Sequence, residues 1–243
     1  MTLAIIGGTG LTSLAGLEIA RREMVHTPYG EPSAPVTHGD LHGRRVIFLA
    51  RHGYGHTIPP HRVNFRANLW ALKHVGAEQL VAVAAVGSID DAFKPGDLAF
   101  PDQIIDYTAG REHTYFDEDV NHIDFTYPYD PKLRQRMVAA AEEANVGYVA
   151  GGCYAATQGP RLETAAEIKR LARDGSTMVG MTGMPEAALA RELNLAYATC
   201  AVCANWAAGL HGQETVAMND IEANLNQGMA QVRSLLGAFI PRL

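Results

Sequence analysis

Short apolar runs rich in Val, Ile, Leu and Ala alternate along this chain with longer segments of helical periodicity. We predict strands at Leu3–Ile6, Arg45–Ala50, Gln79–Val86, Leu98–Ile105, Val149–Ala156, Met178–Met181 and Leu195–Ala204. We predict helices at Asn64–Val75, Pro131–Ala144, Thr164–Arg173, Pro185–Leu193 and Asn219–Phe239. Such alternation is typical of an α/β fold with a central mixed, largely parallel β-sheet flanked by α-helices. No repeat or Pro/Ser-rich linker divides the 243 residues, so we expect a single domain over 1–243.

Charge and hydropathy narrow the class of partner. The 20 Lys and Arg against 26 Asp and Glu give a net charge of −6, which argues against a general nucleic-acid binder. The N-terminus has no basic segment followed by an apolar one, and no run of about 18 apolar residues occurs. We therefore expect no signal peptide, no membrane partner and a cytoplasmic location.

The three cysteines and the histidine-rich segment do not predict a metal site. Cys200 and Cys203 form a C-x-x-C, but residues three apart in a strand point to opposite faces, so we expect two buried thiols. With Cys153 they make a low, odd count that suits a reducing compartment. No H-x-x-x-H falls on a clear helix. The basic residues of one segment are interpreted as surface charge: His61, Arg62 and Arg66.

Polar or glycine residues follow the predicted strands. Gly7-Gly8-Thr9-Gly10 follows the first strand, where it indicates either an anion site or a tight turn. Arg51-His52 ends the second strand, and the planar Arg51 fork suits a phosphate. Later junctions carry Glu163, Thr182 and Asn205, of which Glu163 is either a ligand contact or a partner of the helix dipole. Since ligands in α/β sheets lie beyond the carboxyl ends of strands, these groups predict a site for an anion and a heterocycle.

Five segments, in this order and spanning nearly the whole chain, carry a more specific signal. They are Ile5-Ile-Gly-Gly-Thr-Gly-Leu11, Ala50-Arg-His-Gly53, Val63-Asn-Phe-Arg-Ala-Asn-Leu-Trp-Ala-Leu72, Gly159-Pro-Arg-Leu-Glu-Thr164 and Val179-Gly-Met-Thr-Gly-Met-Pro-Glu186. They resemble the trimeric purine nucleoside phosphorylase and methylthioadenosine phosphorylase family. The resemblance implies reversible phosphorolysis, in which phosphate attacks the anomeric carbon, the purine leaves and a pentose 1-phosphate forms. It implies no metal and no organic cofactor, with inorganic phosphate as co-substrate.

The resemblance also implies roles for individual residues. Phosphate would be held by the side chains of Thr9, Arg51, His52 and Thr182 and by the backbone of Ala85. The nucleoside would be held by Met181, Leu162, Glu163, Asn205 and Ala207. The 5′ substituent would be surrounded by Met218, Ile221 and His122, the last from the neighbouring subunit of a homotrimer. Ala84 departs from the family, because methylthioadenosine enzymes commonly place a phosphate-contacting Thr there.

The base-binding positions depart from the adenosine-type pattern. Where adenosine-type members carry Thr-Asp-x-Asp, this chain has Ala204-Asn205-Trp206-Ala207, and it has Glu163 where those members tend to have Ser or Thr. Both features resemble the 6-oxopurine phosphorylases. The chemistry agrees, because hypoxanthine offers an N1–H to an ionised Glu163 whereas adenine N1 is itself an acceptor. Asn205 is suited to bind a protonated N7 and O6.

We therefore expect phosphorolysis of 5′-methylthioinosine to hypoxanthine and 5-methylthioribose 1-phosphate. In this hypothesis Asn205 stabilises the departing base, Glu163 orients it, and His52 acts at the phosphate. Three alternatives stay open. A general inosine/guanosine phosphorylase would need a polar 5′ contact, and a methylthioadenosine phosphorylase is what overall similarity alone suggests. A catalytically silent purine-binding protein would not need the phosphate residues.

Overall fold

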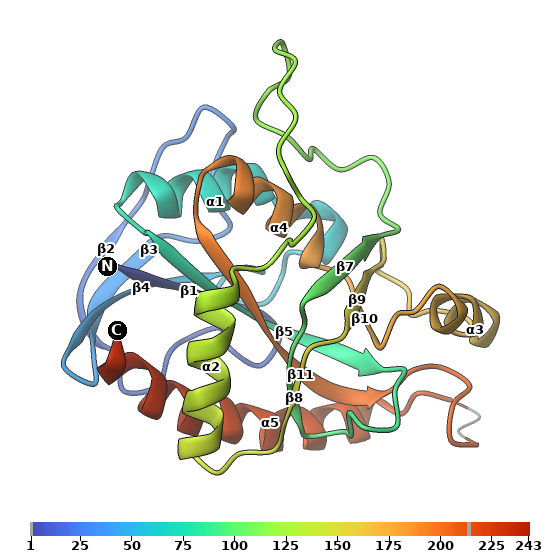
Figure 1. Ribbon diagram of the computed structural model, residues 1–243. Helices are drawn as coiled ribbons and strands as arrows, with labels where there is room; N and C mark the ends of the chain where they lie inside the picture. The colour runs from blue at the N-terminus through green and yellow to red at the C-terminus, as the bar shows by residue number, and fades with distance from the viewer. Residues whose placement is uncertain (1, 213–214) are drawn as a thin grey trace.

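The computed structural model describes residues 2–212 and 215–243, and the strands in them form one eleven-stranded sheet (Figure 1). The strands are β1 (Leu3–Gly7), β2 (Glu18–Glu23), β3 (Val36–Leu41), β4 (Arg44–Ala50), β5 (Gln79–Ser88), β6 (Leu98–Phe100), β7 (Gln103–Asp106), β8 (Tyr148–Ala150), β9 (Cys153–Ala156), β10 (Met178–Gly180) and β11 (Ala196–Trp206). The helices are α1 (Phe65–His74), α2 (Pro131–Glu143), α3 (Ala165–Arg173), α4 (Gly183–Glu192) and α5 (Met218–Phe239).

Strand β5 is the centre of the sheet because three strands pair with it. β1 and β11 run parallel to it on its two sides, and antiparallel β10 pairs only with its last residues, Gly87 and Ser88. The main path is β2-β3-β4-β1-β5-β10-β9-β7, and β11 carries β6 and β8 away from it. The pairs within β4-β1-β5-β11 are parallel and those of β2 and β3 are antiparallel. The expected mixed α/β sheet is confirmed.

Apolar side chains cover both faces of the central strands, as helices on both sides of a sheet require. In β1, Ala4 and Ile6 belong to the core shared with α1 and α4. Leu3 and Ile5 belong to the core shared with α2 and α5. Figure 1 shows α1 and α4 together on one side of the sheet, with α2 and α5 packed on the other. The alternation of faces along each strand therefore builds two cores around one sheet.

The five predicted helices are confirmed, each end within a residue or two of its expected place. Two predicted strands are wrong as single elements. Leu98–Ile105 divides into β6 and β7 around Pro101, and Val149–Ala156 divides into β8 and β9 because Gly151 and Gly152 take φ of 113° and 106°. Strands β2 and β3 are not among the predicted strands. β2 lacks an apolar run, because it is a largely exposed strand of charged residues at one end of the sheet.

The cysteines lie as the strand geometry predicts. Cys200 and Cys203 are buried in the two opposite cores, and burial raises the pKa of each thiol to about 12. No group of three or more His, Cys, Asp or Glu side chains in residues 2–212 and 215–243 is arranged to hold a metal ion. In the same residues, no helix has both the length and the apolar character that crossing a bilayer demands.

The two glycines inside α5 give a matched test of its packing on β11. A methyl group at Gly228 would overlap Val202, a fully buried residue of β11, whereas at Gly237 the nearest atom lies 3.7 Å away. We expect Gly228→Ala to lower the free energy of unfolding by about 1–3 kcal/mol through overpacking. Gly237→Ala should raise it by up to ~1 kcal/mol through helix propensity. Urea titration of both variants measures this, and equal shifts would contradict the packing.

Candidate active site

The sheet leaves an interval along one side of β5. β1 pairs with this side only as far as Val83, and β10 begins to pair with it at Gly87. Alternate residues of a strand direct their peptide groups to the same side, so the peptide of Ala85 faces the interval. A cavity of about 580 Å³ opens here, a volume typical of small-ligand sites.

Most of the predicted site residues line this cavity. They are Thr9, Arg51, His52, Ala85, Leu162, Glu163, Met181, Thr182, Asn205, Ala207 and Ile221, together with Ala84. They come from the ends of β1, β4, β5, β10 and β11, from the loop between β9 and α3, and from α5. Two predicted residues do not line it in this chain: Met218, which is 69% exposed, and His122, which is exposed in the loop 109–129.

Arg51 forms a buried ion pair with Glu186 beneath the cavity. Its Nε and Nη2 donate to the two carboxylate oxygens at 2.7 and 2.9 Å, and its Nη1 donates to the Val83 carbonyl at 2.9 Å. Burial alone would lower the pKa of Arg51, but the Glu186 carboxylate outweighs burial and the pKa lies above its usual value. Tyr197 donates a further hydrogen bond, at 2.9 Å, to Glu186. Both partners of the pair are charged and almost fully buried.

This pairing changes the expected role of Arg51. A guanidinium has five N–H groups, and three are directed at Glu186 and Val83, so one on Nη1 and one on Nη2 remain for a ligand. Glu186 occupies the edge of the guanidinium formed by Nε and Nη2, so the phosphate contact expected of Arg51 stays a prediction that concerns the two remaining N–H groups. Gly8 allows the arrangement, since a Cβ there would lie 2.7 Å from Arg51 Nη1 and 2.8 Å from the Val83 carbonyl. No local pattern indicates this contact, because Glu186 lies 135 residues from Arg51 along the chain.

His52 lies beside Arg51 as a neutral imidazole. Burial, followed by the positive charge of Arg51, lowers the pKa of His52 to about 4. Its Nδ1 lies 2.8 Å from the Ile58 carbonyl, which only accepts, so Nδ1 carries the proton and Nε2 is an acceptor. The neighbouring His56 packs edge-on against His52, and its Nε2 lies 3.0 Å from Thr9 Oγ1. His56 lines the cavity and was given no role from the sequence.

Asn205 is directed into the cavity by an irregularity in β11. The register of β11 on β5 shifts between Cys203 and Asn205, and bulges of this kind re-aim side chains near sites. Asn205 Nδ2 donates to the Trp206 carbonyl at 2.6 Å, which fixes which side of the amide carries nitrogen. One N–H and the Oδ1 acceptor of Asn205 remain for a ligand. The Trp206 ring packs against that of His211 at a tilt of 37° and does not line the cavity.

Glu163 is a cavity group and not a helix cap. Thr164 caps α3, and Glu167 closes a capping box with it, so the helix start is satisfied without Glu163. One carboxylate oxygen of Glu163 accepts a hydrogen bond from Thr157 at 2.7 Å. Glu163 therefore lines the cavity and is not needed at the helix start, and its contact with a ligand stays a prediction.

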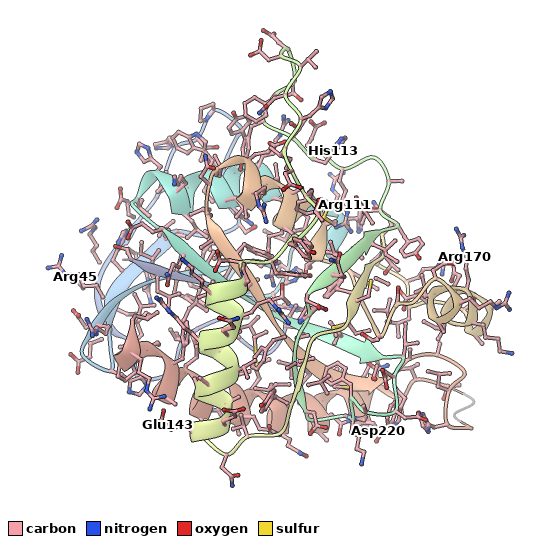
Figure 2. The ribbon with its side chains drawn as sticks, viewed as in Figure 1. Arg45, Arg111, His113, Glu143, Arg170 and Asp220 are labelled. Carbon is pink, nitrogen blue, oxygen red and sulfur yellow. The ribbon has the colours of Figure 1, made fainter. Side chains whose placement is uncertain are left out.

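Arg111 joins the long loop 109–129 to the walls of the cavity. It donates to the carbonyls of Met181 and Met184 at 2.8 and 2.6 Å and to those of Thr157 and Gln158 at 3.3 and 2.8 Å. Figure 2 shows Arg111 where this loop meets the ends of β7 and α4. No local pattern indicates that Arg111 binds four carbonyls, because those acceptors lie 46 to 73 residues away along the chain.

A family model and three relatives place the chain among known proteins. The model described as "Phosphorylase superfamily" matches residues 2–241. The chain belongs to the phosphorylase superfamily. A protein of Pseudomonas syringae named "Probable S-methyl-5'-thioinosine phosphorylase" is 54% identical over 240 residues, 98% of this chain and 97% of that protein. A "6-oxopurine nucleoside phosphorylase" of Pyrococcus furiosus is 43% identical, over 98% and 91%. The solved methylthioadenosine phosphorylase of Schistosoma mansoni with adenine superposes with TM-score 0.94 at 29% identity, over 100% and 91% of the two chains.

The first test of this phosphorylase concerns its buried ion pair. Glu186→Gln would leave the Arg51 charge without a carboxylate and would place an amide N–H against an Arg51 N–H. Breaking a buried pair costs about 3–5 kcal/mol. Glu143→Gln is the matched control, because Glu143 forms an exposed pair with Arg242, and exposed pairs contribute about 0–1 kcal/mol. Urea unfolding of both variants measures the difference. Equal destabilisation by the two changes would show that the buried pair is not a structural requirement.

The second test uses the low pKa of His52. Free imidazole titrates near 6.5, so between pH 6.5 and 4 the unfolded chain binds a proton that folded His52 does not. This contribution to stability is present above pH 6.5 and is lost as pH falls toward 4, by about 3 kcal/mol. We expect His52→Gln to flatten the fall in unfolding free energy over this range. His26→Gln, at an exposed histidine, should leave the slope unchanged, and an unchanged slope in His52→Gln as well would refute the assignment.

Proposed function

We propose that this chain is a 5′-methylthioinosine phosphorylase, which converts 5′-methylthioinosine and phosphate into hypoxanthine and 5-methylthioribose 1-phosphate. The observation that carries the proposal is the pair of polar groups in one cavity, Glu163 and Asn205, with Ala207 where adenosine-type relatives have a second acid. The printed names of the Pseudomonas syringae and Pyrococcus furiosus relatives support a 6-oxopurine preference.

Glu163 and Asn205 match the hydrogen-bonding edge of hypoxanthine. The free oxygen of Glu163 accepts the N1–H, and the remaining N–H of Asn205 donates to O6. Asn205 Oδ1 accepts the N7–H that forms as the base leaves. The bond that Asn205 donates to O6 strengthens while negative charge develops on the purine, and the bond from N7–H forms only as the base leaves. Both therefore stabilise the transition state more than the ground state. An adenine in the same pose would place its N1 lone pair against the Glu163 carboxylate.

Phosphate binds at the interval in the sheet. Thr9 and Thr182 supply hydroxyls, Ala85 supplies its backbone N–H, and Arg51 supplies two N–H groups. The Thr182 hydroxyl makes no capping bond to α4, which supports its use for a ligand. Because Nε2 of neutral His52 is an acceptor, it binds the protonated oxygen of monohydrogen phosphate. An unprotonated oxygen then faces the sugar.

The reaction balances without a cofactor. A phosphate oxygen forms a bond to the anomeric carbon while the C1′–N9 bond breaks and its electron pair goes to the purine. Monohydrogen phosphate loses one proton and hypoxanthine gains one. The cavity residues hold the reacting groups in line, and positioning of this kind supplies a large part of an enzyme's rate enhancement.

An apolar wall beside the sugar supports a methylthio group at the 5′ position. The cavity is lined here by Val216, Ile221 and Leu225. No carboxylate or amide side chain of the described residues 215–225 lines it. Met218 lies outside the cavity of the isolated chain, and His122 is exposed on the projecting loop. We propose that a homotrimer brings His122 of a neighbour to this 5′ end. Light scattering would then give three times the mass of the chain.

A two-by-two nucleoside panel tests the function. Methylthioinosine, methylthioadenosine, inosine and adenosine vary position 6 and position 5′ independently, and base release is followed with and without phosphate. We expect kcat/KM for methylthioinosine to exceed that for methylthioadenosine by at least ~100-fold, since unpaired buried polar groups discriminate by up to ~10⁴–10⁵. The double variant Asn205→Asp with Ala207→Asp should reduce this ratio at least tenfold.

Each alternative function has its own outcome in this panel. Equal or faster cleavage of methylthioadenosine indicates a methylthioadenosine phosphorylase and contradicts the proposal. Inosine cleaved as well as methylthioinosine indicates a general 6-oxopurine phosphorylase. Binding of methylthioinosine without phosphate-dependent release of base indicates a silent purine-binding protein.

A further inference from the structure

Thr157 occupies a rigid place at the carboxyl end of β9, next to the base-facing carboxylate. Its N–H donates to the Gly180 carbonyl at 2.8 Å, which ties it to the end of β10. Its carbonyl accepts from Arg111 Nη2 at 3.3 Å. The backbone of Thr157 is therefore held from two sides, so the direction of its hydroxyl is set by the fold.

The single proton of the Thr157 hydroxyl has a preferred acceptor. Oγ1 lies 2.7 Å from Glu163 Oε1 and 3.3 Å from the Gly180 carbonyl, so the shorter and charge-assisted bond is to Glu163. Oε1 is thereby occupied on the protein side. Oε2 is the oxygen that stays available for a donor in the cavity.

We propose that Thr157 is a positioning residue that makes the 6-oxopurine preference possible by orienting Glu163 as an acceptor. The inference rests on the proposed function, because it assigns Glu163 to the N1–H of hypoxanthine. Without the hydrogen bond from Thr157, the Glu163 side chain is free to rotate about bonds that this hydrogen bond otherwise holds fixed. Its carboxylate then meets N1–H in only a fraction of its conformations.

The same hydrogen bond favours one type of base over the other. A hydroxyl donor binds an ionised carboxylate about twice as strongly as a neutral carboxyl group. Hypoxanthine needs the ionised form, whereas adenine could bind Glu163 only if the carboxyl carried a proton toward N1. Loss of Thr157 therefore weakens binding of the 6-oxopurine and leaves the 6-aminopurine unchanged or slightly improved. A purely structural loss would lower both activities equally.

Thr157→Val tests the inference, because valine keeps the shape of threonine and removes the hydroxyl. We expect the ratio of kcat/KM for methylthioinosine to that for methylthioadenosine to fall about tenfold, the loss expected for a hydrogen bond to a charged group. Thr157→Ser restores the hydroxyl and should recover most of the ratio. Thr157→Ala repeats the measurement without the branched side chain if the valine variant is unstable.

Thr108→Val is the matched control. Thr108 Oγ1 donates to Asp106 at 2.7 Å in an exposed Thr–carboxylate pair that does not line the cavity, so this change should leave the ratio as in the wild type. An unchanged ratio in Thr157→Val and Thr157→Ala, or a ratio that Thr157→Ser fails to recover, would overturn the inference. The wild-type panel tests the proposed function separately. A wild type that prefers methylthioadenosine refutes the proposed function, whatever the variants do.

Discussion

The buried pair of Arg51 and Glu186 is the contact on which the cavity depends. Residues 135 positions apart meet in it, and it joins the end of β4 to the first turn of α4. Val83 of β5 and Tyr197 of β11 add hydrogen bonds, so four elements converge on two side chains. Removing two charges from water is costly unless nearly every polar atom is satisfied, and here the bidentate geometry satisfies most of them. The pair holds both side chains in place beneath the cavity. The Glu186 carboxylate also neutralises the charge of Arg51, which would otherwise attract an anionic ligand.

The proposed phosphate site is consequently built from directed N–H and O–H groups more than from net charge. Of the two basic residues expected to hold phosphate, Arg51 is neutralised by Glu186 and His52 is uncharged at neutral pH. A phosphate bound there keeps most of its negative charge. In the proposed reaction that charge faces the developing positive charge on the sugar, which is where it lowers the barrier.

Much of the fold follows from local patterns, and the site follows only in part. Buried strands such as β1 and β5 are recognisable because both faces are apolar, and the helices because their periodicity and first-turn signals agree. The apolar pattern does not predict β2, because the charged residues of this strand are mostly exposed. It predicts β8 and β9 as one strand, because hydrophobicity does not show the backbone conformation of the two glycines between them. The lining of the cavity was predictable from strand ends. The Glu186, Thr157 and Arg111 contacts were not, since each depends on distances across the fold.

Those unpredicted contacts concern how the base-facing groups are supported. Asn205 owes its orientation to the carbonyl of Trp206, and Glu163 owes one bond to Thr157, whose own backbone is held by Arg111. In the proposed function, base preference therefore depends on supporting groups as well as on the two side chains that are proposed to face the purine. A relative with the same Glu and Asn but without these supports would present the same atoms with less order. Hydrogen bonds discriminate between two bases only when the protein groups that the wrong base leaves unpaired cannot find another partner. Such a relative would therefore show a smaller ratio of kcat/KM for 6-oxo over 6-amino purines.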